Sequence, residues 1–155
     1  MTPRQAVDRV RAVPADMALL LEGRSGDERH PDLGWTPAGY VSHVTDNLRI
    51  WAERLAGARL AGVVDVQGYD PDALAEARGY GSVPAAAALW SLPIAADAWA
   101  RSVSAALEEQ VVLRHAKRGP QRAEDVARNN AHDAVHHLWD IRRILAYADG
   151  TGGGV

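Results

Sequence analysis

Two histidines in the last third of the sequence have the spacing of a metal-binding pair. His132 and His136 lie four residues apart in a segment that has neither glycine nor proline. In a helix, that spacing places both side chains on one face, one turn apart. Two imidazoles so placed can bind one metal ion through nitrogens at about 2.0–2.1 Å. The residue after His132 is Asp133 rather than glutamate, so the HExxH pattern of zinc proteases is absent.

A third histidine, His43, is the candidate that completes such a site. It lies on the flank of a second predicted helix, between the apolar stripe and the polar face, and shares that flank with Asn47 and Arg54. The histidine pair lies on a similar flank of its own helix, beside Asp140 and Arg143. If the two flanks face each other across a bundle, they line the kind of cleft in which bundle metal sites are built. If each flank faces water, the histidines have no such role, and periodicity leaves both possibilities open.

The other histidines have different expected roles. His137 lies about 100° around the helix from His136, so we expect it to make a structural hydrogen bond. Asp133 and His137 are themselves four residues apart, which makes them a rival site to the histidine pair. His30 and His115 fall in or near predicted loops, where we expect surface positions.

Several neighbours of these histidines are candidates for supporting roles. Asp140 follows His136 by four residues and could orient an imidazole ring through a hydrogen bond. Trp35 precedes the helix of His43 and could line the mouth of a pocket, as could Asn47 on the same flank. Arg54 or Arg143 could bind an anionic group. No Ser-His-Asp order, phosphate-binding loop or pair of catalytic carboxylates identifies a catalytic residue, which therefore stays unknown.

Composition narrows the class of protein. The chain has 155 residues, a formal net charge of −3, no cysteine, and Lys117 as its single lysine, a bias that indicates a GC-rich genome. No basic stripe predicts nucleic-acid binding, and no apolar run is long enough to span a membrane. Without an N-terminal apolar segment of the signal-peptide kind, we expect a cytoplasmic protein that acts on a small molecule. We expect one domain over residues 1–149 and a flexible Gly-rich tail over 150–155.

Helix start and stop signals outline five helices. The predicted ranges are 2–21 with Pro14 inside, 36–57, 71–79, 84–107 with Pro93 inside, and 122–147. The connection at 110–121 includes a possible strand at 111–113. This order predicts an all-α four-helix bundle with a short extra helix between the second and third long helices; an orthogonal helical array is the alternative. Trp51, Trp90, Trp99 and Trp139 are expected to fill the core.

Two segments resemble a known family. The run from Gly34 to Val44, GWTPAGYVSHV, is similar to the W-[ST]-P-x5-H opening of the second helix in DinB-like (DinB/YfiT-type) proteins. The run from Asn130 to Ile141, NAHDAVHHLWDI, resembles the H-x3-H-H segment of the last helix in that superfamily. One departure is Ala38-Gly39, which stands where the pattern often has an acidic helix former.

The resemblance implies a four-helix bundle whose open site holds a divalent metal through three histidines, which match His43, His132 and His136. It also implies frequent homodimers. Activities in the superfamily include thiol transfer with mycothiol or bacillithiol and mycothiol-dependent maleylpyruvate isomerisation. Imidazole ligands suit zinc, nickel, iron and copper alike; we expect zinc first, with nickel, iron or manganese as alternatives.

These observations lead to three hypotheses about function. Three neutral ligands leave a bound ion its full charge and an open position, so the ion can lower the pKa of a thiol or of water. The first hypothesis is a metal-dependent S-transferase that uses a low-molecular-weight thiol of the mycothiol type. The second is a metal-dependent hydrolase. The third is a non-catalytic bundle that binds a small ligand or a partner protein.

Overall fold

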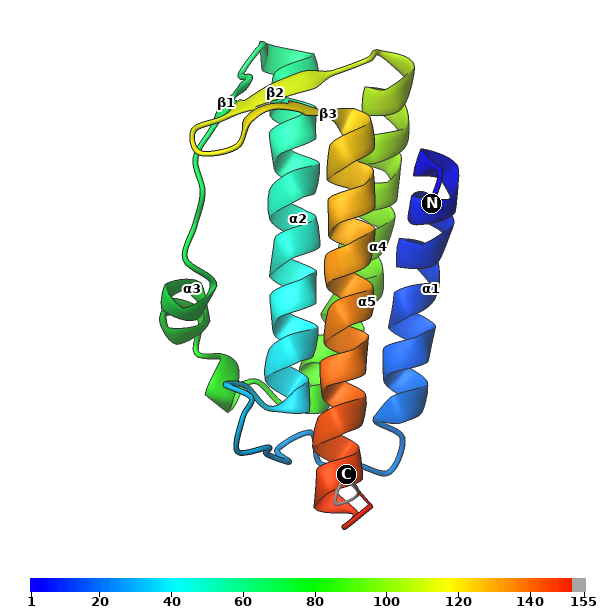
Figure 1. Ribbon diagram of the computed structural model, residues 1–155, viewed down its shortest axis with the longest axis vertical. Coiled ribbons are helices and arrows are strands. Elements are labelled where there is room, and N and C mark those ends of the chain that lie inside the picture. Colours follow the sequence, from blue (N-terminus) through cyan, green and yellow to red (C-terminus); the bar gives the residue numbers. More distant parts are fainter. Residues whose placement is uncertain (152–155) are drawn as a thin grey trace.

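Four long helices and one short helix carry most of the chain in the computed structural model, which describes residues 1–151 (Figure 1). The helices are α1 (Pro3–Leu20), α2 (Pro37–Ala61), α3 (Pro71–Arg78), α4 (Ala85–Glu108) and α5 (Ala123–Ala148), with a 3₁₀ turn at Tyr80–Ser82. Three short strands, β1 (Asp65–Val66), β2 (Val112–His115) and β3 (Gly119–Arg122), complete the fold. All but the first two residues of the predicted Gly-rich tail lie outside the described residues.

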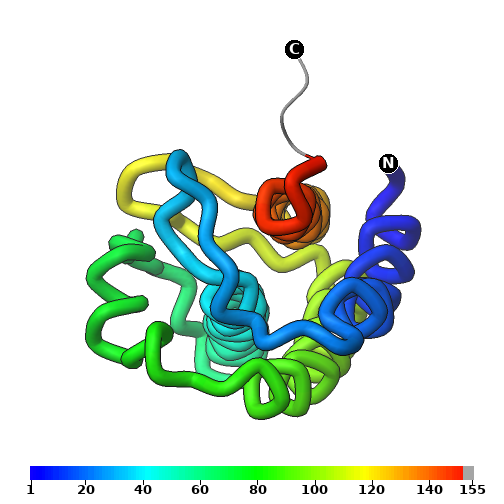
Figure 2. The backbone as a smooth tube through the Cα atoms, turned by 90° about the horizontal axis from the view of Figure 1, so that it is seen from below, coloured from blue at the N-terminus to red at the C-terminus, as the bar shows by residue number. Residues whose placement is uncertain are grey.

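The long helices form a four-helix bundle, as predicted, with the short extra helix α3 between the second and third of them. Helices α1 and α2 each pack against both α4 and α5, and the end-on view shows the four axes arranged in a ring (Figure 2). Helices α2 and α4 run in the same direction, because the segment between them returns along the side of the bundle and carries α3 (Figure 1). Their axes are close to parallel, which rules out the orthogonal array.

Helix boundaries follow the capping residues of the sequence. The Thr2 and Thr36 side chains accept hydrogen bonds from the backbone N–H groups of Gln5 and Gly39, and each threonine is followed by proline. The predicted end of α2 at Gly57 is wrong, because the helix continues to Ala61. A glycine inside a helix costs only about 1 kcal/mol, and it is Gly62 that adopts the left-handed conformation, with φ of 66°.

A small sheet closes one end of the bundle, where the sequence indicated only a possible strand at 111–113. Strand β2 pairs in parallel with β1 and antiparallel with β3, so that Asp65 lies opposite Arg114 and His115 opposite Gly119. The β2–β3 turn comprises residues 116–118 and projects beside α2 and α5 (Figure 1). The sheet adds to the all-helical prediction without changing the bundle.

The core lies between the four long helices, and large apolar side chains from each of them are fully buried. Trp99 is 0% exposed, and Trp51 is also buried, as predicted. Trp90 and Trp139 are 71% and 59% exposed, so their predicted core positions are wrong. Each lies on the outward face of its helix, where helical position outweighs side-chain hydrophobicity. Among the described residues, no helix is both long and apolar enough to cross a membrane.

Candidate metal centre

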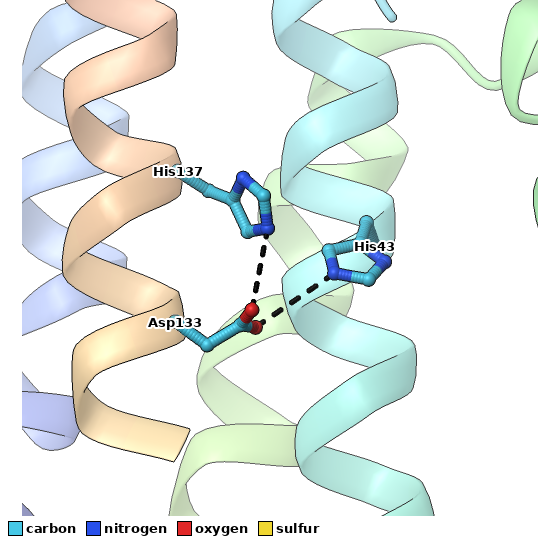
Figure 3. Close-up of side chains that lie close together, drawn as sticks. All are labelled: His43, Asp133 and His137. Atoms are coloured by element: carbon cyan, nitrogen blue, oxygen red, sulfur yellow. Dashed lines mark ion pairs between the residues drawn. The ribbon is translucent and has the colours of Figure 1, made fainter. Parts of the chain in front are cut away.

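Three potential metal ligands from two facing helices lie close together (Figure 3). His43 comes from the second turn of α2, and Asp133 and His137 come from successive turns of α5. Asp133 Oδ2 lies 3.7 Å from His43 Nε2, and Asp133 Oδ1 lies 3.4 Å from His137 Nε2. The three donor atoms all lie within 4.8 Å of one another. The four-residue spacing on α5 and the packing of α5 on α2 therefore create one cluster.

The donor set fits a divalent transition metal. Two imidazole nitrogens and one carboxylate oxygen form a common ligand set for zinc and for non-haem iron. Around a four-coordinate ion with bonds of 2.0–2.1 Å, donors lie about 3.3–3.4 Å apart, close to the two separations from Asp133. His43 is 5% exposed, and no protein group in the described residues bonds its Nδ1. That atom lies on a different edge of the ring from Nε2, which faces Asp133, so the fit to a metal rests on the donor types and their spacing.

Interactions within the cluster shift the pKa values of Asp133 and His137 in opposite directions. Burial raises the pKa of the Asp133 carboxyl, but hydrogen bonds to His137 and His43 outweigh burial and hold that pKa below its ordinary value. Burial lowers the pKa of His137, whereas Asp133 and then Asp140 raise it, and the net direction is upward. Asp133 is thus an ionised carboxylate with a histidine on each side, as a cation ligand should be.

Neighbouring side chains orient the two imidazole rings. His137 Nδ1 lies 3.0 Å from Oδ2 of the buried Asp140, an arrangement that directs Nε2 toward the cluster. Asp140 was predicted to orient a ligand imidazole, and the ring it contacts at hydrogen-bond distance is that of His137. Trp35 packs on His43 with ring centroids 4.9 Å apart. Gly39 permits this packing, because a Cβ at that position would lie 3.0 Å from the Cβ of Trp35.

A polar chain holds the carboxylate from the cleft side. Asn47 Nδ2 donates to Asp133 Oδ2 at 2.9 Å, and the Tyr69 hydroxyl donates to Asn47 Oδ1 at 2.8 Å. Burial, with a further contribution from the Asp133 charge, raises the pKa of Tyr69 to about 12, so the phenol keeps its proton. Asn47, a pocket candidate from the sequence, thus contacts the cluster, and Tyr69 from the segment before α3 is an addition that no motif indicated.

The cluster opens into a cleft of about 1170 Å³ between α2, α5, the β2–β3 turn and the segment before α3. This volume is slightly above the usual range of about 300–1,000 Å³ for small-molecule sites. His43, Asn47, Trp51 and Arg54 line it from α2, at helical spacings that place them on one stripe. The cleft-facing stripe of α5 carries Asn130, Asp133 and His137. Trp35 also lines the cleft, in agreement with its expected position.

The structure does not bring His132 and His136 to the cluster. His132 is exposed and lines the edge of the cleft, and the side chain of His136 is 58% exposed and lies 3.6 Å from Asp140. The two rings stack on each other with centroids 6.3 Å apart, on the outer side of α5. Arg143 approaches Asp140 at 3.8 Å and does not line the cleft. The rival pair Asp133 and His137 thus faces His43.

The pair His132 and His136 and the pair Asp133 and His137 differ in position by one residue, which is about 100° around α5. His137 lies three residues after Ala134 and four before Ile141, both buried, so it flanks the core side of the helix. His136 lies two residues after Ala134, about 200° around, and points away. Comparing the angular position of each histidine with the positions of the buried residues of its own helix would have identified Asp133 and His137 as the inward pair.

Comparisons with known proteins agree with this fold. The model of the DinB superfamily matches residues 6–141. Among solved structures, the chain is similar to YfiT from Bacillus subtilis, a probable metal-dependent hydrolase with an unusual four-helix bundle topology. The TM-score is 0.81 at 18% sequence identity, and the alignment covers 96% of this chain and 87% of YfiT. No curated protein matches the chain.

Proposed function

The chain belongs to the DinB superfamily, and we propose that it is a divalent-metal-dependent enzyme that transfers a low-molecular-weight thiol to an electrophile. The observation that carries this proposal is the cluster of His43, Asp133 and His137 on the wall of a cleft of about 1170 Å³. A cleft of this size has room for two organic reactants, as a transferase requires.

The proposed ligands are His43, Asp133 and His137, in place of His43, His132 and His136. When bound there, a zinc ion or another divalent metal would act as a Lewis acid that lowers the pKa of a thiol or of water toward neutrality. With Asp133 as one ligand, the metal-loaded site would have one positive charge less than a site of three imidazoles. The negative charge of Asp133 also attracts a divalent cation more strongly than a neutral molecule.

The surrounding residues have the roles of positioning the ligands and limiting water access. Asp140 fixes the ring of His137, Asn47 fixes Asp133, and Trp35 covers one face of His43. Such support keeps the three donors close to their working positions before the reactants arrive. In the transfer itself, the thiol sulfur bonds to the electrophilic carbon, the thiol proton passes to solvent, and any leaving group departs with its bonding electrons.

Mycothiol is the first thiol to test, because the sequence resembles proteins that use it and because a GC-rich composition fits that choice. A hydrolase is the second candidate. Two histidines and one carboxylate also form the ligand set of known zinc hydrolases, and the similar protein YfiT is a probable metal-dependent hydrolase.

The deciding experiment uses untagged protein loaded with zinc or nickel. We expect loss of free thiol when mycothiol and a chromogenic electrophile are added, and no reaction above background with the His137→Gln variant. Cleavage of an aryl ester without thiol, at a rate unaffected by mycothiol, would favour the hydrolase. Absence of both reactions in metal-loaded protein would leave the non-catalytic bundle.

A further inference from the structure

The end of the cleft next to the β2–β3 turn has a concentration of positive charge. Arg54 on α2 and Lys117 and Arg118 in the turn all line the cleft. In the described part of the chain, none of these three side chains forms an ion pair with a carboxylate, whereas nine other arginines do (Arg9, Arg24, Arg49, Arg59, Arg78, Arg101, Arg114, Arg128 and Arg143). The charge at this end is therefore not balanced by the protein.

Arg54 is held in place by contacts that leave its charge unpaired. Its guanidinium carbon lies 4.7 Å from the centroid of the Trp51 ring and 5.9 Å from that of Tyr69, and one nitrogen donates to the Gln67 carbonyl. Burial lowers the pKa of Arg54, Tyr69 raises it by a smaller amount, and the Arg118 charge adds a still smaller lowering. A fixed guanidinium with free N–H groups is well suited to bind a carboxylate or phosphate.

His115 adds a largely buried polar side chain to this end of the cleft. It is 7% exposed and lines the cleft, and its Nδ1 accepts hydrogen bonds from the backbone N–H groups of Lys117 and Arg118 at 3.1 and 3.3 Å. The proton of the neutral ring is therefore on Nε2, which bonds no other group in residues 1–151. Burial and then the charges of Arg118, Arg54 and Lys117 lower the pKa of His115, so the ring stays neutral.

The basic end and the metal centre face the same cleft from one stripe of α2. Arg54 follows His43 by eleven residues, which is three turns and a rise of about 16 Å along the helix axis. A molecule that spans this distance could place a reactive group at the metal centre and an anionic group at the basic end.

We propose that Arg54, His115, Lys117 and Arg118 form a subsite for the carboxylate or phosphate group of an elongated organic substrate. The proposal rests on the proposed function for the identity of the reacting end. Arg54 and Arg118 supply the charge, Lys117 adds a third cation at the entrance, and Nε2 of His115 supplies a neutral donor beside them.

The test is the binding of inorganic phosphate and of succinate to zinc-loaded protein at low ionic strength, followed by titration calorimetry and by the imidazole NMR signals of His115. We expect binding that shifts the His115 signals, and affinity about tenfold weaker in Arg54→Gln and in Arg118→Gln, since each loses a charged hydrogen bond. The matched control Arg11→Gln removes an exposed charge on α1 and should change affinity less than twofold.

Two further measurements separate this subsite from the metal centre. Because phosphate can also bind zinc, the His43→Gln/His137→Gln variant is titrated in parallel, and it should keep the affinity of the wild-type protein. The subsite is overturned if neither anion binds, if Arg54→Gln binds as tightly as Arg11→Gln, or if binding disappears only in the histidine variant. Failure of the proposed function would instead appear as absent metal or absent thiol transfer with anion binding intact. A preference between phosphate and succinate identifies the anionic group.

Discussion

The two ends of the cleft lie on the same stripe of α2 but differ in whether their charged groups are paired within the protein. At the metal end, Asp133 lies between His43 and His137, and Asp140 and Asn47 hold the members of the cluster in place. At the basic end, Arg54 and the two cations of the β2–β3 turn have no carboxylate partner in the described residues. The potential ligands at the metal end are therefore held by neighbouring groups, whereas the positive charge at the basic end has no partner of opposite charge.

This difference indicates which end needs a metal and which needs a substrate. Protein ligands around a metal require support by neighbouring groups, because the ion fixes their positions within tenths of an ångström. A substrate subsite gains specificity from charges that are left unpaired until the substrate binds. The following predictions test the contrast, in order of decreasing effect.

The largest expected effect is stabilisation of the protein by metal. Zinc at 100 times its dissociation constant should stabilise the fold by about 2.7 kcal/mol, which for a domain of this size is a rise in Tm of about 5–10 °C. Scanning calorimetry of metal-free protein with and without zinc measures it. Arg118→Gln should show the same rise, because it alters only the basic end, and His137→Gln should show little. Equal rises in Tm for Arg118→Gln and His137→Gln would contradict the contrast between the metal end and the basic end.

The next effect concerns the carboxylate that orients His137. Asp140→Asn should lower metal affinity by about 10–100-fold, because loss of an outer hydrogen-bond partner loosens the ligand ring. Competition with a chromogenic chelator measures the affinity. The matched control is Asp46→Asn, a second buried carboxylate, which accepts from Tyr80 at 2.8 Å and pairs with arginines on the other side of α2. That variant should lose stability and keep its metal affinity.

How much of the fold could be predicted from the sequence depends on how far apart the interacting residues lie along the chain. Thr36-Pro37 and Asp70-Pro71 marked two helix starts, because capping is decided within one turn. The two-residue strand β1 gave no such signal, since its hydrogen bonds join residues almost fifty positions apart.

The site shows the same limit. Polar flanks and helical spacing left open whether α2 and α5 face each other or water, and the structure places His43 of α2 beside Asp133 of α5. The choice between the pairs at 132/136 and 133/137 depends on the rotation of α5 about its own axis, which its contacts with α1 and α2 decide. His115 was expected at the surface, yet the pairing of β2 with β1 and β3 buries it beside the cleft.

A smaller effect is expected at the polar chain behind Asp133. Tyr69→Phe removes the hydroxyl that donates to Asn47 and should weaken metal binding about two- to tenfold, the range for one neutral hydrogen bond. The chelator competition assay applies here as well. Tyr147→Phe, which removes the hydroxyl of a half-exposed tyrosine, is the control and should have no effect. An effect as large as that of Asp140→Asn would mean that Asn47, rather than Asp140, is the main support.

The smallest predicted effect is a pH dependence from His115. Its folded-state pKa lies below that of the unfolded chain, so the unfolded chain binds more protons as the solution is acidified. The contribution of His115 to stability is therefore present above the unfolded pKa of about 6.5 and is lost as pH falls through the folded pKa. Urea unfolding at pH 7 and pH 5 measures it. His115→Gln should reduce the dependence, and bound phosphate should also reduce it by offsetting the three cations.

Metal analysis of five proteins tests the central claim most directly. The untagged wild-type protein, His132→Ala, His136→Ala, Asp133→Asn and His137→Gln are loaded with zinc, desalted and measured by elemental analysis, with circular dichroism to confirm folding. We predict about one zinc per chain in the wild-type protein and in the variants at 132 and 136, and almost none in the variants at 133 and 137. Loss of zinc at 132 and 136, with retention at 133 and 137, would contradict the assignment and restore the three-histidine site.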